Sequence, residues 1–116
     1  MTHKAYQTTQ RITESPRDSE YRLFGQVTGA LIDARESGIK GGPLAETVDW
    51  NRRLWRTLAA DCMDDRNQLP KEVRATIVSL SLWVTKYSKQ VTRAGAPMEP
   101  LIEVNRTIMQ GLSGAA

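Results

Sequence analysis

Few residues in this chain have side chains suited to catalysis or metal binding. The sequence contains one cysteine, Cys62, and one histidine, His3, so a metal site built from Cys and His ligands cannot be assembled. Asp61, Asp64 and Asp65 lie close together but lack the alternating register and terminal Glu of a calcium loop. No nucleophile is paired with a base in any pattern typical of an active site. We therefore expect no catalytic residues, no metal, no cofactor and no enzymatic activity.

The single cysteine also indicates the compartment. Cys62 falls on the apolar side of a predicted helix, where it is expected to be a small buried hydrophobe, and it has no second cysteine with which to form a disulfide. Residues 1–20 lack the apolar run of a signal peptide, and the longest apolar stretch, residues 77–84, is far shorter than the about 20 residues of a membrane span. We expect a cytoplasmic protein that does not insert into membranes.

Basic side chains at helical spacing suggest contacts with phosphate groups as one function. Glu46 and Asp49 are placed to neutralise part of this set at i, i+3 or i+4 spacing, and the net charge of the chain is only +3. A solvated face of mixed charge is therefore favoured, and direct contact with RNA is the alternative. The residues of this alternative are Arg52, Arg53, Arg56, Lys86, Lys89 and Arg93.

Two predicted helices carry more apolar side chains than one bundle seam would bury. Neighbouring helices could cover all of them, or some could line a groove that accepts an amphipathic helix from another protein. Tryptophan is a favoured anchor in such grooves. The candidate partner-binding residues are Trp50, Leu54, Val78, Leu82 and Trp83.

The elements that must position these side chains are helices. A chain of 116 residues suits one domain, and 40% hydrophobic but only 6% aromatic residues, with few β-branched runs, favours an all-α fold. Apolar periodicity, with prolines at helix starts and glycines after helix ends, predicts about four helices, at residues 16–37, 43–63, 70–92 and 100–111. We expect a small helical bundle at residues 15–112, a flexible N-terminal arm at 1–14 and a frayed end at 113–116.

The third predicted helix has the clearest pattern. Apolar residues recur at spacings of 4, 3, 4, 3 and 4, as in the seam of a helical bundle. Trp83 lies on the flank of this seam, and Val78 and Leu82 lie on the far side. The predicted seam consists of Val73, Ile77, Leu80, Val84, Tyr87 and Val91.

Several short strings along the chain are distinctive when taken together. They are Ala5-Tyr6-Gln7, Ser15-Pro16-Arg17, Glu20-Tyr21-Arg22-Leu23-Phe24, Asp49-Trp50-Asn51-Arg52-Arg53-Leu54-Trp55, Leu80-Ser81-Leu82-Trp83-Val84 and Pro100-Leu101-Ile102-Glu103-Val104-Asn105-Arg106. Together they resemble the FlaF family of flagellar biosynthesis regulators. The similarity covers nearly the whole chain, and the strings at 49–55 and 99–106 are specific in combination, although neither is a catalytic signature.

The resemblance implies a small cytoplasmic protein needed for flagellin production and filament assembly. Members of the family act alongside FlbT, a regulator of flagellin mRNA translation, and are thought to bind flagellin and assist its secretion. The leading hypothesis is a flagellin-binding secretion chaperone and regulator that holds amphipathic flagellin segments helix-in-groove. The alternatives are an RNA-binding regulator of flagellin mRNA and a scaffold that acts mainly through FlbT.

Overall fold

Four α-helices make up the part of the chain that the structure describes. The computed structural model describes residues 16–114, and side chains within 18–111. The helices are α2 (Pro16–Ser37), α3 (Gly41–Cys62), α4 (Lys71–Ala94) and α5 (Glu99–Gly114). The expected all-α fold of four helices is confirmed. The expected arm at 1–14 lies outside the described residues, as do residues 115–116 of the expected frayed end.

Glycine and proline set the helix boundaries, as the sequence predicted. Gly38 and Gly95 follow α2 and α4 with φ of 65° and 69°, in the left-handed region that glycine adopts without strain. Beyond Gly95, the Ala96 amide donates to the Gln90 carbonyl at 3.1 Å, which closes the end of α4. The predicted limits differ from the observed ones at α3, which begins at Gly41 before its proline, and at α5, which extends to Gly114.

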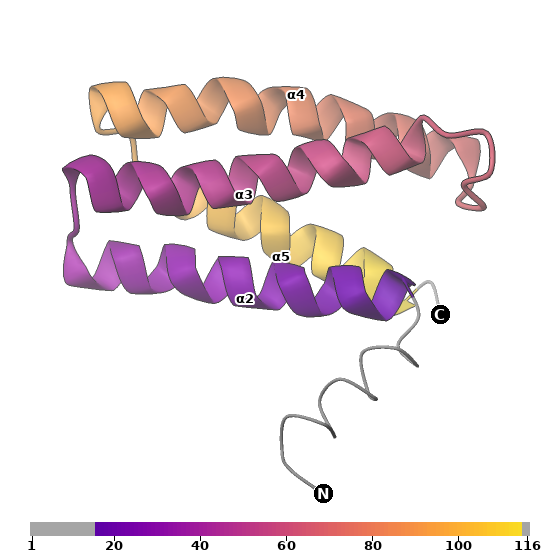
Figure 1. Ribbon diagram of the computed structural model, residues 1–116, viewed down its shortest axis with the longest axis horizontal. Coiled ribbons are helices and arrows are strands. Elements are labelled where there is room, and N and C mark those ends of the chain that lie inside the picture. Colours follow the sequence, from indigo (N-terminus) through magenta and orange to yellow (C-terminus); the bar gives the residue numbers. More distant parts are fainter. Residues whose placement is uncertain (1–15, 115–116) are drawn as a thin grey trace, which may run out of the picture.

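The helices form a layer of three with the fourth behind it. Consecutive helices α2, α3 and α4 run antiparallel side by side, and α5 crosses behind them towards the start of α2 (Figure 1). Helix α3 packs on both α2 and α4, whereas α5 packs mainly on α2 and only slightly on α4. Helix α4 therefore has one extensive neighbour, and much of its circumference faces away from the bundle.

The core lies where α2, α3 and α5 meet. The ring of Phe24 from α2 meets the indole of Trp55 from α3 edge to face, with centroids 5.4 Å apart. Leu101 and Ile102 of α5 are fully buried beside them, and Cys62 is buried as predicted. The core also includes Ile77, Val84 and Val91 of α4, which extend it along the α3 side.

The buried strip of α4 differs from the predicted seam. Val73 is exposed, and Leu80 and Tyr87 are only half-buried. The buried residues keep the 4, 3, 4, 3 spacing, but the strip is turned by about 40° around the helix towards α3, because α4 packs on one neighbour rather than at the centre of a bundle. They are Ile77, Ser81, Val84, Ser88 and Val91.

Candidate functional site

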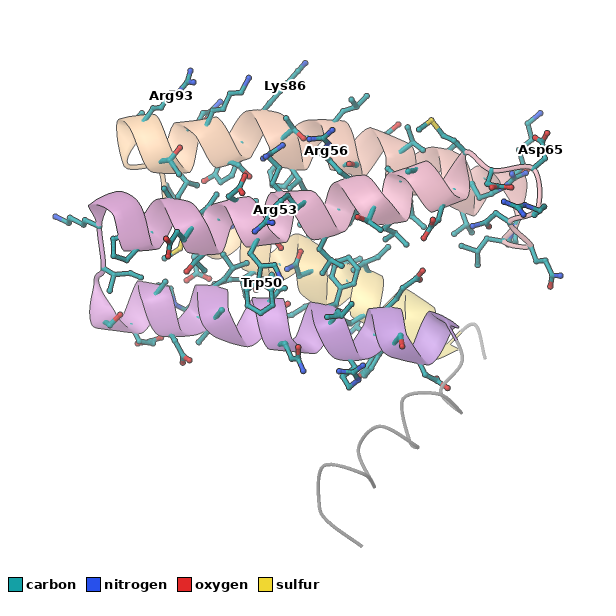
Figure 2. The ribbon with its side chains drawn as sticks, in the orientation of Figure 1. Trp50, Arg53, Arg56, Asp65, Lys86 and Arg93 are labelled. Carbon is teal, nitrogen blue, oxygen red and sulfur yellow. The ribbon has the colours of Figure 1, made fainter. Side chains whose placement is uncertain are left out.

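The predicted partner-binding residues lie in three places rather than along one groove. Trp50 (38% exposed) and the half-buried Leu54 project from the side of α3 that faces α2, and Figure 2 shows the Trp50 ring reaching over α2. Val78 is half-buried and packs against the core, whereas Leu82, one turn further along α4, is 64% exposed. Trp83 is 37% exposed on a third side. Of the two alternatives left open by the sequence, complete burial by neighbouring helices is wrong, since Trp50, Leu82 and Trp83 are exposed.

Trp83 is held within its own helix and by the connection to α5. Its indole stacks on the Tyr87 ring with centroids 5.1 Å apart and an interplanar angle of 12°. The Tyr87 hydroxyl donates to the carbonyl oxygen of Pro97 at 2.6 Å, and burial raises the pKa of that hydroxyl. These contacts fix one face of the Trp83 ring against α4, so less of the ring remains for a partner.

Leu82, the most exposed of the five candidate partner-binding residues, belongs to a stripe that also carries cations. At about 100° per residue, the members of this stripe fall within about 80° of one another on the outside of α4. Figure 2 shows Lys86 and Arg93 extending from α4 on the side away from α3. We call this stripe the outer α4 face; it consists of Val78, Leu82, Lys86, Lys89 and Arg93.

The six basic residues predicted as RNA contacts divide into paired and unpaired groups. Arg52 and Arg53 both bind Asp49, at 2.6 and 3.0 Å, and the hydrogen bond from Arg52 is the main cause that lowers the pKa of Asp49. The other four form no ion pair with any residue that the structure describes; they are Arg56, Lys86, Lys89 and Arg93. Arg53 and Arg56 lie on the exposed side of α3 (Figure 2).

A pocket of about 470 Å³ lies in the groove between α3 and α4, next to the outer α4 face. Asp49 and Arg52 stand on its α3 side, and Lys89 stands on its α4 side. Ser88 lines the pocket and is only 4% exposed. The sequence analysis did not select Ser88, because a lone serine on a helix carries no recognisable signal.

The aspartate cluster forms a hydrogen-bonded turn after α3. The Asp64 carboxylate accepts bonds from the backbone and guanidinium of Arg66, which lower the pKa of Asp64. The Asn67 amide donates to the Asp61 carbonyl at 3.0 Å, and Asp65 projects from the turn (Figure 2). Within residues 16–114, no group of three His, Cys, Asp or Glu side chains is placed to hold a metal ion.

Two asparagines missed by the sequence analysis are fully buried among the core helices. Asn105 on α5 donates to the Asn51 Oδ1 of α3 at 2.7 Å and to the Thr28 hydroxyl of α2 at 3.2 Å. Its own Oδ1 accepts from the Trp55 indole at 2.8 Å. A signal was present, since Asn51 shares the apolar face of α3 with Val48 and Trp55.

Comparison with known protein families gives a match over most of the chain. The family model described as flagellar protein FlaF matches residues 2–112. No curated protein and no solved structure matches the chain. In the region of the chain that the structure covers, no helix is long and apolar enough to cross a membrane. Since the match extends over almost the whole sequence, the chain belongs to the FlaF family of flagellar proteins.

Proposed function

We propose that this chain is a non-enzymatic, cytoplasmic flagellin-binding chaperone and regulator of flagellin synthesis and flagellum assembly. Membership of the FlaF family supports the flagellar role. The observation that favours binding of a helical segment is Leu82, which is 64% exposed on a helix packed extensively against only one neighbour. When a partner covers an apolar side chain in this position, the free energy of the complex is lowered.

The physical need for such a partner follows from the properties of flagellin. The terminal segments of flagellin are amphipathic helices that pack only in the assembled filament, so unassembled subunits expose apolar stripes that promote association. A helical protein with an open apolar stripe can cover one of these segments and release it at export. This role requires contact surfaces but no catalytic chemistry.

Among the five candidate contacts, the structure favours those on the outer α4 face. Leu82 is the most exposed, and Val78 lies one turn before it on the same side. Trp50 lies over the α2 side of α3, Leu54 packs half-buried against the core, and Trp83 is partly covered by Tyr87. We therefore assign the central contact to Leu82 and Val78. The other three candidates are to be tested by substituting each of them separately.

Copurification of the full chain with flagellin tests the proposal. We expect wild-type protein to retain intact flagellin, and to lose it when the terminal flagellin segments are removed. Leu82→Ser should reduce retention, whereas Met63→Ser, at a side chain that is 66% exposed at the end of α3, should not. If flagellin without its terminal segments binds as well as intact flagellin, the proposed covering of a flagellin helix is wrong.

RNA binding is a second candidate function, favoured by the four cations that lack ion pairs within the described residues. Contacts with phosphates would displace counterions, so the affinity for flagellin mRNA would fall steeply with salt. Absence of RNA binding at low salt would dismiss this candidate. Nuclease treatment during the copurification separates it from protein binding, and recovery of FlbT in place of flagellin would favour the scaffold role.

A further inference from the structure

The side of α4 opposite its buried strip carries two large apolar side chains at adjacent positions. Leu82 and Trp83 are both exposed there. Helix α4 lies at the edge of the layer that it forms with α2 and α3, and its extensive contacts are with α3 (Figure 1). A second molecule placed along this edge would remove both side chains from water without displacing any helix of the bundle.

The residues around this apolar pair are arranged symmetrically about the midpoint between Leu82 and Trp83. Going outwards from the midpoint, Ser79 and Lys86 lie about 5 Å along the helix to either side, and Glu72 and Arg93 lie about 16 Å to either side. At about 100° per residue, these exposed positions fall within about 100° of one another around α4. We call them the α4 pairing surface; it consists of Glu72, Ser79, Leu82, Trp83, Lys86 and Arg93.

This symmetry makes the surface complementary to a second copy of itself. A two-fold axis through the midpoint, perpendicular to α4, runs the two helices antiparallel and places Leu82 of each copy against Trp83 of the other. The same axis places Glu72 of each copy against Arg93 of the other. Glu72 and Arg93 form no ion pair with any residue in 16–114, so these opposite charges meet without breaking an existing pair.

Charge also selects the direction of the pairing. In a parallel pair each residue would meet its own copy, so Lys86 and Arg93 would each face a like charge. In the antiparallel pair Lys86 faces the hydroxyl-bearing Ser79, and the two Lys86 positions lie about 10 Å apart along the helix axis, where salt screens most of their repulsion. The antiparallel arrangement is therefore the favourable one.

We propose that two copies of this chain pair through the α4 pairing surface, antiparallel and related by a two-fold axis. Leu82 of each copy covers the Trp83 indole of the other, of which one face is already stacked on Tyr87. The contact is a single helix pair about 32 Å long, typical of small and transient interfaces, so we expect monomer and dimer to exchange at micromolar concentrations. The pairing goes beyond the proposed function, because it needs no flagellin, and it competes with a flagellin segment for Leu82.

Sedimentation velocity of the full chain with exchanged charges tests the pairing. We expect wild type to sediment as monomer and dimer in proportions that depend on concentration. Glu72→Arg and Arg93→Glu each place like charges together at both ends of the contact, so each should raise the dimer dissociation constant by about tenfold. Glu46→Arg, at an exposed position on α3, is the matched control and should leave this constant unchanged.

An equimolar mixture of the two single variants is the sharpest form of this test. In the mixed dimer, the copy with two arginines meets the copy with two glutamates, so opposite charges face each other at both ends. We expect the mixture to recover a dissociation constant close to that of wild type. Because positions 72 and 93 lie about 32 Å apart on one helix, recovery requires contact between copies.

The apolar centre is tested by a separate substitution. Leu82→Asp should abolish the dimer at concentrations where wild type is half dimeric. The matched control is Val73→Asp, because Val73 is 42% exposed but lies on the side of α4 that carries the buried strip. Val73→Asp should keep the dimer, and circular dichroism checks that each variant is folded.

Several results would overturn the pairing. A wild-type chain that stays monomeric throughout the micromolar range, a dimer that persists in Leu82→Asp, or a mixture of the charge variants that fails to recover would each do so. If Leu82→Asp does not fold, the mixture decides the outcome, because both of its substitutions are at exposed positions.

These measurements contain no flagellin, so failure of the pairing is distinct from failure of the proposed function. Retention of flagellin by a chain that never dimerises would overturn the pairing and leave the proposed function intact. A dimer with the expected response to charge exchange, in a chain that retains no flagellin, would support the pairing and overturn the proposed function.

Discussion

The Trp55 indole of α3 donates a 2.8 Å hydrogen bond to the Asn105 side-chain oxygen of α5, across a separation of 50 residues in sequence. Both side chains are fully buried, and Asn105 also donates to Asn51 and Thr28. One asparagine therefore connects α2, α3 and α5. Because buried polar groups must be satisfied, this network favours one position of α5 on the α2–α3 pair.

Removal of the Asn105 amide should destabilise the fold strongly. Asn105→Ala leaves the Trp55 N–H without its acceptor and the Asn51 oxygen without its donor, which should lower the free energy of unfolding by about 2–4 kcal/mol. Urea denaturation followed by circular dichroism measures this change. Gln110→Ala, at an exposed amide on the same helix, should cost less than about 0.5 kcal/mol. Equal effects of the two substitutions would show that the network contributes nothing.

The three tryptophans should differ in their access to a soluble quencher. A variant with Trp50→Phe and Trp83→Phe retains only Trp55, which is fully buried, so acrylamide should quench its fluorescence weakly. Trp55→Phe retains the two part-exposed indoles, which should be quenched much more. The ratio of Stern–Volmer constants measures the difference. Strong quenching of the folded Trp55-only variant would contradict the buried position of this indole.

Truncation of two nearby side chains on α4 should lower the free energy of unfolding by very different amounts. Val84 is fully buried, so Val84→Ala should lower the free energy of unfolding by about 1–3 kcal/mol. Leu82→Ala removes a larger side chain but should cost under about 0.5 kcal/mol, because that side chain is mostly in solvent. Thermal or urea denaturation distinguishes them. A large loss from Leu82→Ala would mean that Leu82 belongs to the core rather than to a contact surface.

The Cys62 thiol should be protected in the folded protein. Burial, followed by the nearby charges of Glu20 and Asp61, raises the pKa of this thiol above its ordinary value. The native state therefore holds its proton to higher pH than the unfolded state does, and the thiol contributes stability that is lost as pH rises through the alkaline range. Ellman's reagent should react slowly with native protein and rapidly after denaturation. Equally rapid reaction in both states would contradict the burial.

Sequence reasoning identified the helices because their ends depend on local chemistry. Glycine after α2 and α4, and Pro70 immediately before α4, specify boundaries without reference to the rest of the fold. Packing between helices is a different matter, since it depends on which neighbour each face meets. The buried strip of α4 faces α3 and therefore includes Ser81 and Ser88, whereas the hydrophobic pattern of the sequence assigns both serines to the solvent-exposed side.

The candidate site was predictable only in part, for the same reason. The place of Leu82 opposite the apolar seam left open whether a neighbouring helix covers it, and the structure shows it 64% exposed. Separation of Trp50 from Leu82 did not follow from sequence, because it depends on α2 covering one side of α3 and α4 the other. The roles of Asn51 and Asn105 were missed because amphipathic analysis treats amides as outward-facing, although the place of Asn51 on the apolar face of α3 was a signal of burial.

Methyl spectroscopy of the labelled full chain, recorded during addition of monomeric flagellin, tests the central claim most directly. If the outer α4 face covers a flagellin segment, the methyl signals of Leu82 and Val78 should shift with added flagellin, while those of the buried Leu58 and Leu101 should remain in place. Flagellin binding that leaves the Leu82 and Val78 signals unchanged would contradict the account.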